Sequence, residues 1–181
     1  ATAYVPRLLN GNAGDWPVFE KIALSGAHAC GISAGSDLYC WGSYDMAQFG
    51  DGRKGDGFDK YSFRSQAKYS EYLKPVKVGD SKWVDIAALN QNSCGIKDDG
   101  TLWCWGIAEW GVLGIGDVFE TYTADTPEDS VTYTASFQAL IDSGDCFAQF
   151  YSKDTAASQS RRYPPGCTVP IQVGTASNWV S

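Results

Sequence analysis

The pattern of hydrophobic and polar positions along the chain predicts short β-strands. Residues 83–89 are rich in side chains that favour strands, and residues 93–96 and 102–105 flank a tight turn. Successive residues of a strand point to opposite faces, and in 102–105, which reads Leu-Trp-Cys-Trp, both faces are apolar. A sheet with one face in water would alternate apolar with polar residues. We therefore expect a sheet that is covered on both faces, as in blades stacked around an axis.

The chain contains an internal repeat. Residues 22–42 recur as residues 86–106 without a gap, and the shift of 64 positions carries Cys30 and Cys40 onto Cys94 and Cys104. A segment that runs from a proline to a tryptophan precedes each copy, and it occurs a third time; the three segments are 6–16, 75–83 and 170–179. The sequence therefore predicts two full repeats and the opening of a third.

The cysteines indicate how the strands pair. Cys94 and Cys104 lie symmetrically about Asp99, so in an antiparallel hairpin they would face each other at a separation that a disulfide accepts. The first repeat has the same arrangement, and two cysteines remain as a local pair. We predict the disulfides Cys30–Cys40, Cys94–Cys104 and Cys146–Cys167. Buried free thiols and a metal site are the alternatives, but zinc sites favour closer cysteine spacing with histidine support, and the chain has one histidine.

The two hairpin turns differ in sequence. Asp98-Asp99-Gly100 suits a three-residue loop that ends in a left-handed residue, a conformation that glycine adopts at low cost. The first repeat has Ala34-Gly35-Ser36 at these positions. We therefore expect its turn to be of a different type.

The repeats resemble a known family. Each Cys-Trp-Gly is followed by a glycine-rich corner, residues 49–52 (Phe-Gly-Asp-Gly) or 113–116 (Leu-Gly-Ile-Gly), and His28 occupies the family's histidine position, where the second copy has Asn92. In these features the chain resembles the regulator of chromosome condensation repeat, over residues 6–52, 75–116 and 170–181. The resemblance implies an all-β fold of β-propeller type, with blades of four antiparallel strands and about seven blades in a ring. Its best-known members are guanine-nucleotide exchange factors for a small nuclear GTPase, and others are secreted or cell-surface binding modules.

The repeat limits define the expected organisation of residues 1–181. Repeat 1 covers about residues 6–52 and carries an insertion at 53–74; repeat 2 covers about 75–116 and carries an insertion at 117–169; repeat 3 begins at 170–181. A propeller needs roughly four to eight blades. We therefore expect a section of a longer protein, with a ring or an open stack of several subunits as the alternative.

Charge and cysteine content bear on partners and location. The formal charge of −7 disfavours nucleic acid and anionic membranes, which are bound chiefly by clustered basic residues, and no apolar run approaches the roughly 20 residues that span a bilayer. Disulfides indicate an oxidising compartment, so we expect an extracellular or cell-surface protein. This expectation disfavours the nuclear exchange factor, which stays a less favoured alternative.

The sequence shows no chemistry typical of an enzyme. It has no nucleophile motif, phosphate-binding loop or dinucleotide fingerprint, and we expect no catalytic residue, no cofactor and no metal site. We interpret His28 as a hydrogen-bonding residue of a blade. Weak calcium binding at Asp51, Asp56 and Asp59, and paired carboxylates within the insertions, remain less favoured alternatives.

The insertions are the predicted interaction surface. Residues 53–74 carry six basic and three acidic side chains (+3), and residues 117–169 carry eight acidic and three basic ones (−5). Aromatic side chains with mixed charge are typical of recognition surfaces, although they could also form a local core. The candidate interface residues are Phe58, Tyr61, Phe63, Tyr69, Tyr72, Tyr122, Tyr133, Phe147, Phe150 and Tyr151. We therefore expect a structural or adhesive protein that binds protein partners or other copies of itself, with a secreted partner- or glycan-binding module as the alternative.

Overall fold

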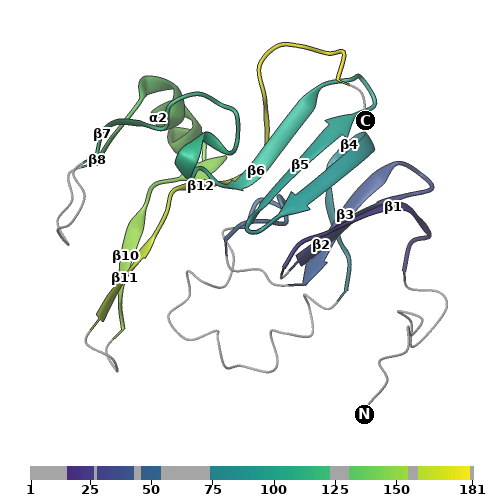
Figure 1. Ribbon diagram of the computed structural model, residues 1–181, viewed down its shortest axis with the longest axis horizontal. Coiled ribbons are helices and arrows are strands. Elements are labelled where there is room, and N and C mark those ends of the chain that lie inside the picture. The colour runs from purple at the N-terminus through teal and green to yellow at the C-terminus, as the bar shows by residue number, and fades with distance from the viewer. Residues whose placement is uncertain are drawn as a thin grey trace.

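The structure is a computed structural model that describes residues 16–26, 28–42, 46–53, 74–122, 131–154 and 159–179, with the backbone alone at 121, 122, 150–154 and 159–163. Figure 1 shows antiparallel strands with one short helix beside them. The elements are β1 (Phe19–Leu24), β2 (His28–Ser33), β3 (Asp37–Gly42), β4 (Val76–Leu89), β5 (Asn92–Lys97), β6 (Leu102–Ile107), a 3-10 turn (Glu109–Gly111), β7 (Phe119–Tyr122), β8 (Val131–Tyr133), α2 (Ala135–Asp142), β9 (Cys146–Phe147), β10 (Phe150–Asp154), β11 (Gln159–Tyr163) and β12 (Gly166–Gln172).

The strands form two four-stranded blades that share β4. Blade 1 consists of β1, β2, β3 and the first part of β4, where Val76 and Lys77 pair with β3. Blade 2 consists of the second part of β4, from Trp83 onward, with β5, β6 and β12. Gly79, at a φ of 57°, lies in the irregular stretch between Lys77 and Lys82, which is the last residue of β4 that pairs with blade 1. The expected blades of four antiparallel strands are confirmed.

Sequence repeats and blades are out of phase. The proline-led segment at 75–83 supplies the outer strand of blade 1 before it becomes the inner strand of blade 2, and 166–172 likewise completes blade 2. The aromatic residue that corresponds to Trp83 is Phe19, since each lies over a glycine of the second strand and precedes a bulge in the same register. Pairing Trp16 with Trp83, as the sequence suggested, is therefore wrong. Trp16 instead packs edge-on against Trp41, with ring centroids 6.3 Å apart.

The two hairpin turns have the same backbone shape. Ser36 has a φ of 62° and Gly100 a φ of 79°, and the amide of each donates to the carbonyl three residues earlier, at 2.8 and 2.9 Å. The expectation of a different turn in the first repeat is therefore wrong. Pairing across β2 and β3 requires the same left-handed residue, so serine adopts a conformation that costs an L-residue roughly 1–2 kcal/mol.

Replacing Ser36 by glycine should stabilise the protein. Glycine adopts the left-handed conformation without that cost but loses more backbone entropy on folding, so we expect a gain of about 0.5–1 kcal/mol in the free energy of unfolding. Urea unfolding of the oxidised protein measures it. Ser36→Ala is the matched control, because it removes the hydroxyl and keeps the Cβ, and it should bring no gain. A gain of the same size with alanine would contradict the backbone explanation.

An apolar core lies between the blades. One face of blade 1 supplies Cys30, Ile32, Leu38 and Cys40, and blade 2 supplies Trp83 and Trp105. Trp103 and Trp105 lie on the face of β6 opposite Cys104, so the all-apolar pattern of 102–105 reflects a strand that is covered on both sides. Gly50 lies against the indole of Trp105 so closely that a Cβ there would meet its Nε1 at 2.6 Å.

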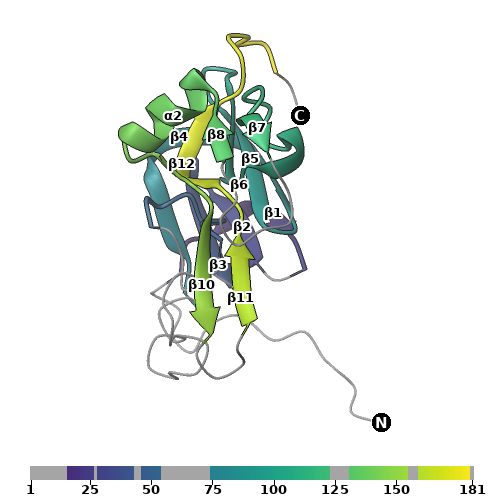
Figure 2. The ribbon, with the colours of Figure 1, turned by 90° about the vertical axis from the view of Figure 1, so that its left-hand side faces the viewer.

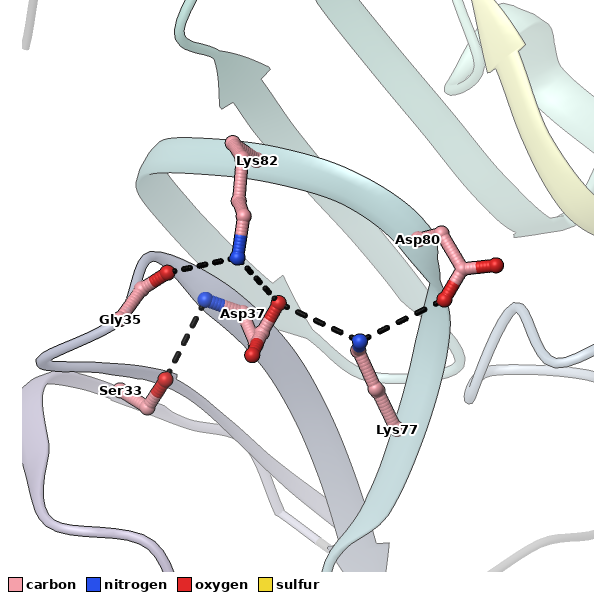
Figure 3. A network of polar contacts seen from close by, with 6 residues as sticks. All are labelled: Ser33, Gly35, Asp37, Lys77, Asp80 and Lys82. Atoms are coloured by element: carbon pink, nitrogen blue, oxygen red, sulfur yellow. Dashed lines mark hydrogen bonds and ion pairs between the residues drawn. The ribbon is translucent and has the colours of Figure 1, made fainter.

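A polar network fixes the β2–β3 turn to β4 (Figure 3). The Asp37 carboxylate accepts from Lys82 Nζ at 2.8 Å and pairs with Lys77 Nζ at 3.3 Å, and Lys82 Nζ also donates to the Gly35 carbonyl at 2.9 Å. The hydrogen bond from Lys82, with further help from Lys77, holds the pKa of Asp37 below its usual 3.8. The network therefore joins the tip of blade 1 to the segment where the chain enters blade 2.

The stability that Asp37 contributes should vanish in acid. A carboxyl whose pKa is lower in the folded chain stabilises fully above its unfolded pKa, near 3.8, and loses this effect as pH falls through the folded pKa. We expect Asp37→Asn to lower the melting temperature at pH 7 and the difference from wild type to close below about pH 3.8. Melting curves across this range, with Asp80→Asn as control at an exposed partner of Lys77, provide the test. A difference that is constant with pH would contradict it.

The second insertion folds onto the outer edge of blade 2 (Figures 1 and 2). Helix α2 begins at Thr134, whose side chain accepts from the Phe137 amide, and Phe137 packs with Cys146 and Cys167 into a second apolar core. Strand β8 pairs with β7 beside this helix. Residues 166–169 belong to β12 of the blade, so the insertion ends earlier than the expected boundary at 169.

Candidate functional site

The predicted cysteine pairs are all formed in the structure. Cys30–Cys40 and Cys94–Cys104 each join directly opposed residues of a hairpin. Cys146–Cys167 joins β9 to β12 and so ties the insertion to the blade. None of the cysteines is free.

His28 connects the two blades. Ser93 of blade 2 donates its hydroxyl proton to the Gln48 carbonyl at 3.1 Å, so it accepts from Nε2–H of His28 at 2.9 Å. The other ring nitrogen lies 2.8 Å from the Ser25 hydroxyl, and Trp105 Nε1 donates to the same Gln48 carbonyl at 2.9 Å. His28 is buried and engaged at both nitrogens, which supports its interpretation as a hydrogen-bonding residue of a blade.

The predicted aromatic interface is only partly placed by the structure. Phe147 is 2% exposed and therefore does not lie on the surface, whereas Tyr133 is half-buried and stacks on Phe119 with ring centroids 5.7 Å apart. Tyr122, Phe150 and Tyr151 are described by their backbone alone. The remaining candidates, Phe58, Tyr61, Phe63, Tyr69 and Tyr72, and with them the expected contact between the two insertions, lie outside the described residues.

A different apolar surface lies on β1. Phe19, Ile22 and Leu24 pair with alternate residues of β2, so they share one face of blade 1. Ile22 is 52% exposed and Leu24 more so, and Val18, just before the strand, is also exposed. We call Ile22 and Leu24 the β1 apolar surface. In blade 2 the residue that corresponds to Ile22 is Ile86, which packs into the core between the blades.

The far side of blade 2 also exposes aromatic residues. The Trp179 amide donates to the Gly100 carbonyl at 3.3 Å, just as the Trp83 amide donates to that of Ser36 at 2.9 Å. Yet Trp179 is 44% exposed, whereas Trp83 is 1% exposed. Trp110 is 93% exposed and has a φ of 62°. Positions that are buried between blades 1 and 2 are thus exposed on the outer sides of the pair.

The repeat alignment contains the signal for this surface, although the sequence analysis placed the interface in the insertions. Ile22 and Ile86 occupy the same position of successive repeats, and only Ile86 has a blade of the described chain in front of it.

Within the described residues, no group of three or more His, Cys, Asp or Glu side chains is arranged to hold a metal ion. The described helices include none long and apolar enough to cross a membrane.

Comparison with curated proteins identifies a distant relative. Over 98 residues the chain is 33% identical to the human E3 ubiquitin-protein ligase HERC2, and 32% identical to the mouse protein. The matched region covers 52% of this chain and 2% of HERC2, so the chain corresponds to a small part of that relative. No family model matches the chain.

Comparison with solved structures gives matches with TM-scores below 0.5. The match to the structure of Kap60 bound to yeast RCC1 (Prp20) has 16% sequence identity and a TM-score of 0.49. It covers 90% of the present chain and 27% of the chain in that structure. Prp20p from Saccharomyces cerevisiae, whose structure was described together with its binding properties to Gsp1p and histones, is 24% identical with a TM-score of 0.45. This match covers 70% of the present chain and 28% of the Prp20p chain. With the repeat of 64 residues, its shared bulges and the sequence match to HERC2, the chain resembles the regulator of chromosome condensation repeat family, and its fold is all-β with four-stranded blades of propeller type.

Proposed function

We propose that this chain is a protein-binding module that acts outside the reducing cytosol, in the structural or adhesive assembly of copies of itself, rather than by catalysis. Three disulfides support an extracellular or cell-surface location, because thiols are kept reduced in the cytosol and nucleus. The same reasoning disfavours nuclear nucleotide exchange.

The β1 apolar surface is the observation that carries the proposal. It reproduces, on the outside of blade 1, a face that blade 2 buries against its neighbour through Ile86 and Trp83. Exposed apolar residues that share one strand face are typical of an interaction site. The occupant that we propose is a second copy of this chain, which would bring the far side of blade 2, where Trp110 and Trp179 are exposed. Such a head-to-tail contact closes into a ring or extends into a filament.

Sedimentation velocity of the oxidised protein over a wide concentration range tests this assembly. We expect wild type to form larger species as concentration rises, and Ile22→Ser/Leu24→Ser to stay monomeric. Val84→Ser, at another exposed valine of β4, is the control and should assemble as wild type does. High salt should not weaken a contact made by apolar side chains, whereas it would weaken one made by the oppositely charged insertions.

Two results would count against the proposal. A wild-type protein that stays monodisperse at every concentration would rule out assembly, and if that particle retained a foreign protein or glycan it would support the secreted binding module instead. Alkylatable thiols at Cys30 or Cys40 in the native protein would contradict the extracellular location.

A further inference from the structure

A pocket of about 230 Å³ lies between the blades, away from the β1 apolar surface. Its walls come from the first glycine-rich corner, the bend of β4, the end of β5 and the middle of β12; the lining residues that matter here are Asp51, Val78, Trp83, Lys97 and Pro170. Sites for drug-sized ligands occupy roughly 300–1,000 Å³. The pocket therefore has room for a group of about one amino-acid residue rather than for a large cofactor.

Lys97 brings an unpaired positive charge to this pocket. Its Nζ lies 3.4 Å from the centroid of the Trp103 ring and 5.4 Å from that of Trp83, and among the described residues no carboxylate lies within ion-pair distance of it. Burial lowers the pKa of Lys97, although Asp99 and Asp98 act against this effect. A partly desolvated ammonium without a carboxylate partner gains free energy when a ligand supplies one.

The other polar groups around the pocket leave this charge available. Asp51 also lines the pocket, but its carboxylate accepts from the backbone amide, Nε and Nη2 of Arg53, so its charge is already compensated. Trp83 Nε1 is buried and has no hydrogen-bond acceptor among the described residues. Two donors that lack acceptors thus border one pocket, and Lys97 is the more accessible of them.

The polar groups of the pocket are not part of the repeat. At the position of Lys97 the first repeat has Ser33, and at that of Asp51 the second has Ile115, whereas Gly50 and Gly114 occupy the same place in both. Contacts that build a blade should recur from one repeat to the next. Lys97 is thus a charge that the pattern shared by the two repeats does not require.

We propose that this pocket binds a carboxylate group carried on a small apolar body, with Lys97 as the ion-pair partner and the aliphatic side chains of Val78 and Pro170 against the body. A chain terminus and an acidic side chain of a bound polypeptide carry the same group. The site is separate from the β1 apolar surface, so assembly and carboxylate binding succeed or fail independently.

The probes are N-acetylvaline, which presents a terminal carboxylate, its neutral amide, and N-acetylglutamic acid α-amide, which presents a side-chain carboxylate. Titration of the full oxidised chain, followed by the indole N–H resonance of Trp83 and by calorimetry, gives affinity and location. A hydrogen bond to a charged group contributes about 1.5–3 kcal/mol, so we expect the amide to bind at least about tenfold more weakly than the acid. Whichever acid binds more tightly identifies the source of the carboxylate.

Lys97→Met is the decisive variant, because it keeps an aliphatic stem over Trp103 and removes the charge. It should weaken binding of the acid at least about tenfold and leave that of the amide unchanged. Lys21→Met removes one positive charge at an exposed residue elsewhere and should bind as wild type does. No shift of the Trp83 indole with either acid, or equal binding by wild type and Lys97→Met, would overturn the proposal. Far-ultraviolet circular dichroism confirms that each variant is folded.

Discussion

Replacement of Trp105 by alanine is expected to lower the free energy of unfolding by about 3–5 kcal/mol. The side chain is fully buried between the blades, where it packs with Trp83 at a centroid distance of 5.8 Å and donates to the Gln48 carbonyl. Alanine would leave a cavity beside Gly50, which contacts the indole so closely that it has no room for a Cβ. Urea unfolding of the oxidised protein measures the loss.

Trp110→Ala is the matched control for this prediction. Trp110 lies in the 3-10 turn that follows the strand of Trp105, yet it is almost fully exposed, so its removal should change stability by no more than about 0.5 kcal/mol. Similar losses for the two variants would contradict the placement of Trp105 at the centre of the contact between blades.

Removal of Cys94 and Cys104 together, as alanines, should cost about 2–3 kcal/mol. The bridge closes a loop with a sequence separation of 10, and the estimate follows from the chain entropy that a cross-link of this length removes from the unfolded state. Replacing Cys146 and Cys167, whose separation is 21, should cost slightly more, about 3–3.5 kcal/mol, because the closed loop is longer.

Equilibrium unfolding in urea without reductant compares the two double variants with wild type. Non-reducing peptide mapping serves as the control, since it establishes that the remaining two bridges are intact in each variant. A variant as stable as wild type would mean that its bridge does not constrain the unfolded chain. The reverse order of the two losses would contradict the dependence on loop length.

The elements that could be predicted from the sequence are those with local or repeated signals. Cys94 and Cys104 are symmetric about Asp99, and that symmetry fixes the hairpin register which the structure has. The apolar residues at 102–105 indicated a strand covered on both faces, because each face of β6 meets a different core. These signals depend on the spacing of the cysteines and on the apolar character of successive residues, both of which lie within a short stretch of sequence.

The remaining features depend on contacts between distant segments. Whether a strand belongs to the blade before or after it is decided by pairing partners, and for β4 these lie on both sides. Ser36 gives no local sign of a left-handed turn, since the pairing of Asp37 with β4 and of β2 with β3 imposes it. Phe147 has the composition of an interface residue, and only the pairing of β9 with β12 shows that it is buried.

The shared strand β4 has a consequence for how the protein opens. One strand of 14 residues forms the outer edge of blade 1 with its first part and the inner edge of blade 2 with its second part, so neither blade can separate its edge without straining the other. Local openings in proteins follow cooperative units that often coincide with supersecondary motifs. Here the boundary of such a unit falls inside a continuous strand, and the two blades should exchange their core amides with solvent as one body. A pull applied to either insertion is therefore resisted by both blades together.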